Sequence, residues 1–458
     1  MSDKKTLQNE RNQLFHDFYN NILPKRVPVN VPIPHQVVAQ YGGIDPFEFQ
    51  YDFSKLRDAA EKICDDLAVD ACPIQGVSVL ARIPAYYEYM DSQSFEMGGN
   101  GQVQHPEVSG MLPEDYDYLI EDPYACLLER IIPRQYKGLS LDNPVSRCLA
   151  MDASRASVRT QAMSMGPVIG QLIEKKGYYQ GPPMGSGGFT EAPFDFIGDQ
   201  LRGFSGVSMD IRRDKKRLMA ACEAVLPLMY QFGLPDHPHP EGIISTPLHM
   251  PTFMRPKDVE EMWFPTYQKM LQQFSAKGAR VRAFCEDNWM RYLDMLQDLP
   301  AGHILAFEYG DPKEIKEKLG NRFIITGLYP LELVKTGTPQ QCIDKAKELL
   351  DIMLPGGGYI FGFDKVPMMA SDINLENLIA LLKFVRDYSV YENPGEAFGT
   401  ALNSENFAVD ESIVDFDSKY KFDWEAYKAK HKYVPESAKN CLKKDFESSF
   451  KDNLFLLF

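Results

Sequence analysis

The stretch ARVRAFCEDNWMRYLDML, residues 279–296, decides the fold class of this chain. In its first half apolar side chains alternate with others at a period of two residues, which predicts a strand. Its second half predicts a helix whose apolar face carries Trp289, Tyr292, Leu293 and Leu296. Between the two elements stand Cys285, Glu286, Asp287 and Asn288. Parallel α/β proteins place their chemistry at such a junction, although an acidic helix cap beside a buried cysteine gives the same pattern.

The same order of strand and helix recurs along the chain from residue 177 onward. Further strands are predicted from residue 177 and over residues 241–248, 302–307, 322–326 and 358–361. Helices are predicted over residues 150–176, 214–232, 256–276, 312–319, 339–353 and 375–388, with Thr338 as the cap of the one that starts at 339. Successive βα units of this size indicate a parallel sheet.

Apolar segments nearer the N-terminus supply candidates for two more strands: VDACPI (69–74) and VSVLARIP (77–84). RVPVNVPIP (26–34) suits either a first strand or an extended arm. A total of eight strands favours a closed (β/α)8 TIM barrel over an open doubly wound sheet, and no G-x-G-x-x-G opens a helix. We expect an N-terminal arm at 1–53, the barrel at 54–392, and a C-terminal extension at 393–458 that packs on the barrel or on a partner subunit.

The formal net charge of -15 argues against a nucleic-acid partner, because phosphate contacts need clustered Lys and Arg. No apolar run is long enough to span a bilayer and the first residues carry no apolar targeting segment, so we expect a cytoplasmic protein. The eight cysteines are scattered without a CxxC pair. This spacing predicts free thiols and excludes a structural zinc knot, while a catalytic metal site assembled from separate strands stays open.

In a parallel barrel the residues just past each strand converge on one opening. We predict His249, Glu286 and Glu308 as catalytic residues. A catalytic zinc typically takes three protein ligands, and the predicted candidates are His249, Cys285, Glu286 and Glu308. The residues predicted to bind substrate are Phe189, Asp195, Arg202, Tyr329 and Asp364. Each has a structural alternative: a core histidine, a buried cysteine, a carboxylate that caps a turn, or an arginine that only pairs with the acids of its own helix.

Five longer stretches resemble the uroporphyrinogen decarboxylase superfamily. They are NGQVQHPEVSGMLPEDYDYLIEDP (100–123), APFDFIGDQLRGFSGVSMDIRR (192–213), FMRPKDVEEMWFPTYQKM (253–270), ITGLYPLELVKTGTPQQCIDKAKELLD (325–351) and GGGYIFGFDKVP (356–367). The match covers roughly residues 100–388, and its phrases are specific in combination. The resemblance implies a (β/α)8 barrel with N- and C-terminal extensions. The superfamily includes the decarboxylase and zinc-dependent methyltransferases that work with corrinoid proteins, so the fold alone does not choose a reaction.

The decarboxylase branch carries an N-terminal R-Q-A-G-R phrase that holds the carboxylates of the porphyrinogen, and this chain lacks it. The methyltransferase branch holds zinc with an H-x-C pair at one strand end and a second cysteine on the last strand. In register those positions are Ala283, Cys285 and Asp364, so only the first cysteine is kept. A site built from histidine and glutamate side chains instead resembles a carboxylate-bearing subgroup associated with demethylation of methyl ethers or amines in anaerobes.

The resemblance therefore implies a zinc-dependent methyltransferase that moves a methyl group from an O- or N-methylated small molecule to a corrinoid (cobalamin) carried by a partner protein. A metal or a carboxylic acid would withdraw charge from the substrate heteroatom while the corrinoid attacks the methyl carbon. A decarboxylase of a carboxylated aromatic or tetrapyrrole and a non-catalytic binding barrel are the alternatives. The expected partners are the methylated substrate, the corrinoid protein and a second copy in a homodimer, without nucleic acid or membrane.

Overall fold

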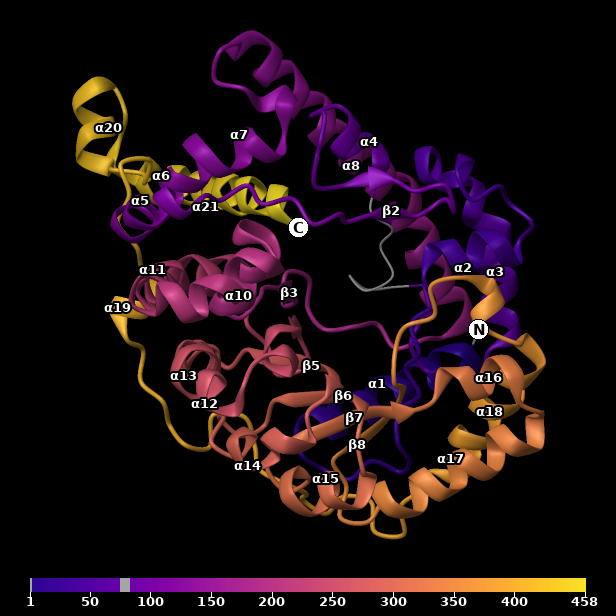
Figure 1. Ribbon diagram of the computed structural model, residues 1–458. Coiled ribbons are helices and arrows are strands. Elements are labelled where there is room, and N and C mark those ends of the chain that lie inside the picture. The colour runs from indigo at the N-terminus through magenta and orange to yellow at the C-terminus, as the bar shows by residue number, and fades with distance from the viewer. Residues whose placement is uncertain (1, 75–82) are drawn as a thin grey trace.

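The computed structural model describes residues 2–74 and 83–458, and a six-stranded parallel sheet lies at its centre (Figure 1). The strands are β3 (Gly188–Phe189), β4 (Ile243–Leu248), β5 (Arg280–Asn288), β6 (Ile304–Tyr309), β7 (Ile324–Tyr329) and β8 (Tyr359–Phe363). Neighbours in the sheet are neighbours in the chain, from β3 to β8. A separate antiparallel pair consists of β1 (Glu96–Met97) and β2 (Val103–Gln104). The mixed α/β class is thus confirmed, and the closed eight-stranded barrel stays a prediction.

Helices surround the strands in the view of Figure 1. Those that precede the sheet are α1 (Ser2–Tyr19), α2 (His35–Tyr41), α3 (Arg57–Asp66), α4 (Pro84–Glu88), α5 (Tyr116–Glu121), α6 (Pro123–Cys126), α7 (Ile132–Gln135) and α8 (Pro144–Lys176). Those between and after its strands are α9 (Pro193–Asp195), α10 (Phe204–Arg213), α11 (Lys215–Gly233), α12 (Pro256–Asp258), α13 (Phe264–Ala276), α14 (Leu293–Leu296), α15 (Pro312–Leu319), α16 (Leu331–Thr336), α17 (Pro339–Met353) and α18 (Leu375–Tyr388). The last three are α19 (Glu411–Val414), α20 (Trp424–Lys430) and α21 (Lys439–Leu454).

The two faces of β5 differ, as its alternating sequence predicts. Val281, Ala283 and Cys285 are fully buried, and β5 packs on α13. The alternate positions Arg282, Phe284 and Glu286 are only partly buried. The predicted apolar face after the strand is also confirmed, since its four residues are all buried: Trp289, Tyr292, Leu293 and Leu296. The helix itself is short, because a 3₁₀ turn over Met290–Tyr292 precedes α14.

The segments predicted as strands before β3 have a different structure. Residues 69–74 form bends and turns instead of a strand, although the backbone of Asp70 makes two bonds to distant segments: Asp70 N donates to Val29 O at 2.8 Å, and Tyr179 N donates to Asp70 O at 2.8 Å. Residues 77–82 of the other predicted strand lie outside the described residues. The strand predicted from residue 177 is instead β3, which follows the Gly-rich turn and pairs with β4 through Gly188.

Helix α1 is fastened to the body of the protein by the buried carboxylate of Asp70. Arg26 donates to it from both terminal nitrogens, at 2.6 and 2.7 Å, and Arg11 Nε lies 3.3 Å from it. Val29 N donates to the same carboxylate at 2.8 Å. Arg11 also donates to the carbonyl oxygens of residues 176 and 177, at the end of α8. The N-terminal segment is therefore held by a shared charge as well as by its apolar side chains.

The C-terminal segment returns to the centre of the molecule, where Figure 1 marks its end beside β3. The Phe458 ring packs on Phe189, Phe196 and Phe232, with ring centroids 5.0–5.8 Å apart. Tyr136 donates a hydrogen bond to the carbonyl oxygen of Leu456. The expected packing of this extension on the rest of the chain is thus seen. No helix within residues 2–74 and 83–458 is long and apolar enough to cross a membrane.

Candidate functional site

Three predicted site residues stand at the carboxyl ends of parallel strands, and two of them touch. His249 follows β4, and its Nε2 lies 2.9 Å from Oε2 of Glu286 near the end of β5. The other ring nitrogen, Nδ1, lies 2.9 Å from Oδ2 of Asp199. The imidazole is therefore held between two carboxylates, with 35% of the His249 side chain and 46% of the Glu286 side chain exposed.

The sheet register explains this contact. Leu248 of β4 lies beside Cys285 of β5, so the next residues along, His249 and Glu286, come side by side at the end of the sheet. Between Cys285 and Asn288 the pairing of β5 with β6 shifts, which bends the end of β5. Asp287, inside that shift, has a left-handed φ of 60°. This irregular ending aims Glu286 at His249 and Asp287 N at the next strand.

The third predicted residue, Glu308 at the end of β6, joins the same row of charges. Its Oε2 accepts a hydrogen bond from Asp287 N at 2.8 Å, and its Oε1 lies 3.2 Å from Lys365 Nζ. The bond to Glu308 raises the pKa of Lys365. The positive charge of Lys365 also lowers the pKa of Glu286. Lys365 thus pairs with Glu308, and its charge also acts on Glu286. We call Asp199, His249, Glu286, Lys365 and Glu308 the charged row.

The two carboxylates beside His249 keep its ring protonated. Burial lowers the pKa of His249, but the hydrogen bonds to Asp199 and Glu286 outweigh burial and raise it from 6.5 to about 11. The bond from His249 correspondingly lowers the pKa of Glu286. At neutral pH the site therefore contains an imidazolium with a proton on each nitrogen and a carboxylate on each side.

Two further carboxyl groups lie behind this row, on the segment that follows β3. Asp195 Oδ1 accepts from the backbone N–H groups of His249 (2.7 Å) and Met250 (2.8 Å), and its Oδ2 accepts from Trp263 Nε1. Burial, followed by the charge of Asp199, raises the pKa of Asp195 to about 6. Asp195 thus fixes the backbone that carries His249, and is not itself placed to touch a ligand.

Glu191 is the second of these groups. It is almost fully buried, one carboxyl oxygen accepts from Gln200 Nε2 at 2.8 Å, and the other has no hydrogen-bond partner among the described residues. Burial and the charge of Asp199 raise its pKa well above 4.5. Glu191 is therefore a buried carboxyl group with one unpartnered oxygen, close enough to Asp199 and His249 for their charges to act on it.

Of the remaining predicted residues only Asp364 borders this row, and the other three lie away from it. The Tyr329 hydroxyl donates to Cys342 O at 2.9 Å in the core, and Phe189 packs on the Phe458 ring. Arg202 pairs with Asp210 at 2.8 Å. This pairing differs from the predicted alternative of Asp195 or Asp199, since the helix carries Arg202 toward α10. Asp364 accepts from the N–H groups of Leu331 and Lys365 at the edge of the site, and burial raises its pKa.

Of the four predicted zinc ligands only His249 and Glu286 lie in contact. Cys285 is fully buried on the α13 side of β5, and burial raises the pKa of its thiol. Both nitrogens of His249 are already bonded to carboxylates, which leaves no lone pair for a metal. Within the described parts of the chain no three His, Cys, Asp or Glu side chains form a metal-binding group. These residues, as placed, do not fit a zinc ion.

Two residues of the row, Asp199 and Lys365, and Glu191 behind it were missed as catalytic or ligand candidates. Glu191 follows β3, and Lys365 follows β8, so both carry the strand-end signal that singled out Glu286. Asp199 has no such signal, because a π-helical segment, Phe196–Arg202, brings it to His249. Leu328, near the end of β7, has a left-handed φ of 69°, a strained conformation of the kind that gathers at functional sites.

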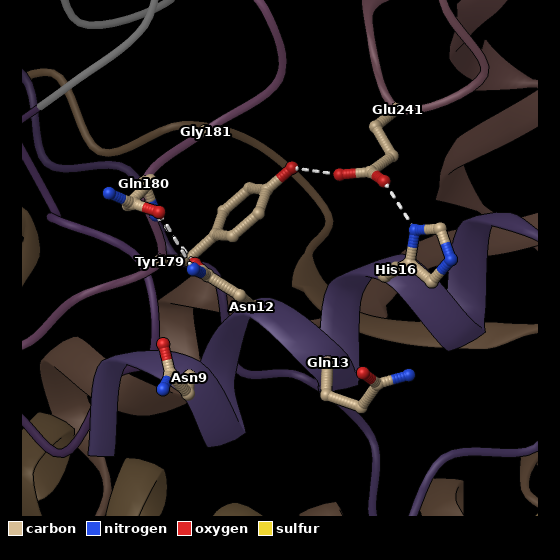
Figure 2. Close-up of a pocket in the computed structure, with 8 residues that line it drawn as sticks. All are labelled: Asn9, Asn12, Gln13, His16, Tyr179, Gln180, Gly181 and Glu241. Carbon is tan, nitrogen blue, oxygen red and sulfur yellow. Dashed lines mark hydrogen bonds and ion pairs between the residues drawn. The ribbon is translucent and has the colours of Figure 1, made fainter. Parts of the chain in front are cut away.

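A cavity of about 400 Å³ lies elsewhere, at the opposite edge of the sheet (Figure 2). Side chains of α1 line it together with Tyr179 and Glu241. The Glu241 carboxylate accepts from the Tyr179 hydroxyl at 2.5 Å and lies 3.0 Å from His16 Nδ1. Glu241 precedes β4, whereas His249 follows it, and a six-residue strand is about 20 Å long. The cavity is therefore not part of the charged row.

Comparison with known proteins supports the fold. No protein family model matches the chain, and no curated protein does. Among solved structures, a methyltransferase from Methanosarcina mazei is similar with a TM-score of 0.53, over 82% of this chain and 98% of that chain. The two sequences are 16% identical. An identity of this size reports on the fold alone, so the comparison shows that this chain and that methyltransferase share a fold.

Proposed function

We propose that this chain is a methyltransferase that removes a methyl group from an O- or N-methylated small molecule and passes it to the corrinoid of a partner protein. The observation that carries the proposal is the His249–Glu286 contact of 2.9 Å at the carboxyl edge of the sheet, with Asp199 behind it. This is an acid poised at the place where parallel α/β proteins carry out their reactions. The methyltransferase-like fold and the sequence resemblance point the same way.

The reaction needs a proton at the heteroatom of the substrate. When the bond between methyl carbon and oxygen or nitrogen breaks, both electrons stay on the heteroatom, and the methyl group leaves to the acceptor without them. The heteroatom must then be protonated to depart as a neutral phenol or amine. In the proposed mechanism that proton comes from Nε2 of His249. The acceptor, a reduced corrinoid, supplies the nucleophile.

The pKa of His249 suits such leaving groups. Phenols and alkylammonium ions have pKa values of about 10, close to the value of about 11 for His249. A group with this pKa carries its proton at neutral pH, so the donating form of the acid is present when the substrate binds. A heteroatom that replaces Glu286 as the partner of Nε2 also removes one of the bonds that raise this pKa. The imidazolium then becomes a stronger acid at the moment when the proton is needed.

The charges of the site disfavour the decarboxylase alternative. Binding a substrate with several carboxylates needs a lining of Arg and Lys side chains. Here the predicted candidate Arg202 is paired with Asp210, and Lys365 is paired with Glu308. Among the described residues the cations at this edge are His249 and Lys365, and the carboxyl groups there outnumber them: Glu191, Asp195, Asp199, Glu286, Glu308 and Asp364. This balance supports a neutral or cationic methylated substrate.

The proposal is tested by mixing the purified protein with chemically reduced cobalamin and a panel of methoxyphenols and methylamines, and following methylcobalamin by its absorbance. We expect turnover with one class, and a loss of roughly 10²- to 10⁴-fold in kcat for both His249→Gln and Glu286→Gln. The control is Glu425→Gln on α20, an exposed carboxylate of the C-terminal extension. Full turnover in both site variants would rule out the assignment, and release of CO₂ from carboxylated aromatics would favour the decarboxylase.

A further inference from the structure

Helix α8 is covered by the rest of the chain along one face only. Its buried residues all lie on that face: Ser154, Gln161, Met165, Val168 and Leu172. No residue in the first ten of the helix, 144–153, is buried. In Figure 1 the helix runs along the outer edge of the molecule. The opposite face, from Val145 to Gly170, therefore meets only solvent in a single copy.

That outer face carries large apolar side chains. Val145, Leu149 and Met163 are 68%, 66% and 70% exposed. Val145 and Leu149 are four residues apart, and Leu149 and Met163 are fourteen residues apart, close to four helical turns. All three side chains therefore lie on one stripe of the helix. Surface helices of monomeric proteins keep this side polar, and contiguous exposed apolar residues mark interaction surfaces.

The second half of the stripe is made of small residues. Ala162, Gly166 and Gly170 are exposed, and a Cβ added at either glycine would meet no atom within 4 Å. Glycine inside a helix costs about 1 kcal/mol relative to alanine. No contact within the described parts of this chain requires glycine at these two positions. The close approach of another helix would require small residues there.

Two opposite charges lie on the same stripe. Asp152 and Arg159 are exposed, and in the part of the chain that the structure describes neither forms an ion pair. They are seven residues apart, about 10 Å along the helix, which is too far for them to pair with one another. Each is therefore a charge available to a partner.

We propose that this face of α8 binds α8 of a second copy, antiparallel, about a two-fold axis between Arg155 and Ala156. In that arrangement Asp152 lies opposite Arg159 of the partner subunit, and Arg159 lies opposite Asp152 of the partner subunit. Val145 and Leu149 lie opposite the small residues at 162 and 166, and Met163 lies opposite Cys148 of the partner subunit. Large residues thus meet small ones and each charge meets its opposite, as a self-complementary interface requires.

The pattern favours a second copy over the other occupants of an exposed helix face. A membrane surface attracts helices with an excess of Lys and Arg, while this stripe has one charge of each sign. An unrelated partner would not require the two halves of the stripe to complement one another. A single two-fold axis explains why one half of the α8 stripe carries large residues and the other half small ones. It is independent of the proposed reaction, because α8 lies away from the charged row.

The test is the mass of the full chain by sedimentation. We expect a dimer, and expect Asp152→Arg or Arg159→Asp alone to weaken it by roughly 10- to 100-fold in Kd, because each change places like charges opposite one another. An equimolar mixture of the two single variants restores complementary pairs at both contacts. The mixture should therefore form a heterodimer with a Kd close to that of the wild-type dimer, at concentrations where each variant alone is mostly monomeric.

A second measurement identifies the register. Met163→Cys should form a disulfide-linked dimer with the native Cys148 on mild oxidation by air and copper, and Met163→Cys combined with Cys148→Ser should not. Lys430→Asp on α20 is the matched control for a surface charge reversal and should leave the dimer intact. A monomeric wild-type chain at all soluble concentrations, or a dimer that ignores both charge reversals, would overturn the proposal.

Discussion

Cys285 and Glu286 are neighbours in the chain but lie on opposite faces of β5. The Cys285 side chain is fully buried on the side that packs on α13, while the Glu286 carboxylate lies 2.9 Å from His249. Successive side chains of a strand point to opposite faces. One position therefore belongs to the core and the next to the charged row.

This separation predicts opposite results for two adjacent substitutions. Glu286→Gln should lower kcat by roughly 10²- to 10⁴-fold, since it removes the partner that sets the proton on His249. Cys285→Ala should leave kcat unchanged and lower the free energy of unfolding by about 1 kcal/mol. Steady-state kinetics and urea denaturation check both. Loss of activity in Cys285→Ala, with the fold intact, would place the thiol in the site.

The protonation of His249 predicts a pH dependence of stability. Its pKa in the folded chain, about 11, lies above the ordinary value of 6.5. The imidazolium therefore stabilises the folded state fully below pH 6.5, and this contribution is lost as the pH rises through 11. The difference in unfolding free energy between wild type and His249→Gln should shrink between those two values. A difference that grows with pH would contradict the assignment.

The placement of the four predicted zinc ligands makes metal content a test of the site. Both His249 nitrogens hold carboxylates and Cys285 faces the core. We therefore expect elemental analysis of the protein, purified without chelator, to find far less than one zinc per chain. Chelator treatment should leave methyl transfer unchanged. One zinc per chain that disappears in Glu286→Gln would show that the row rearranges around a metal.

The packing of the Phe458 ring predicts that truncating this side chain destabilises the protein. Phe458 packs on three phenylalanines, so Phe458→Ala should lower the free energy of unfolding by about 3 kcal/mol. Phe455, three residues earlier, is 44% exposed, and Phe455→Ala is the matched control. Urea denaturation should show a much smaller change for the control. Equal effects would mean that the extension is held by something other than this ring cluster.

The buried carboxylate of Asp70 predicts a large cost for a small change. Asp70→Asn removes the charge that Arg11 and Arg26 share and leaves both guanidinium groups uncompensated, which should cost about 3–5 kcal/mol. Asp294→Asn, which breaks an exposed pair with Lys318, should have no measurable effect. Thermal and urea unfolding measure both. A stable Asp70→Asn variant would show that the other contacts of α1 hold it without this charge.

Local signals predicted the helices well, because their causes lie within a few residues. Thr338 and Gln341 form a reciprocal capping box at the start of α17, and the predicted bounds of α15, α17 and α18 match the structure. The strand predicted from residue 177 lies instead at Gly188–Phe189, and the reason cannot be read from local sequence. A Cβ on Gly188 would meet the carbonyl oxygen of Gly233 at 2.3 Å, so only glycine lets β3 approach α11.

The sequence predicted the residues of the site that follow strand ends. It did not predict the residue that packing between distant segments brings there. The strand-end rule found His249, Glu286 and Glu308, because parallel strands present their carboxyl ends at one edge. It could not find Asp199, since the π-helical turn that aims this residue depends on packing between distant segments. It included Cys285 although the alternation of β5 already assigns that position to the other face.

The order of the sheet has a consequence for how the chain comes together during synthesis. Each strand from β3 to β8 finds its neighbour already made just before it, so the sheet can grow as the polypeptide leaves the ribosome. The N-terminal segment cannot complete its contacts so early. Asn21 donates to the carbonyl of Phe398, 377 residues further on, and such distant closures are the slow ones. We expect the first segment made to be the last to settle, and the first that a protease can cut in a nascent chain.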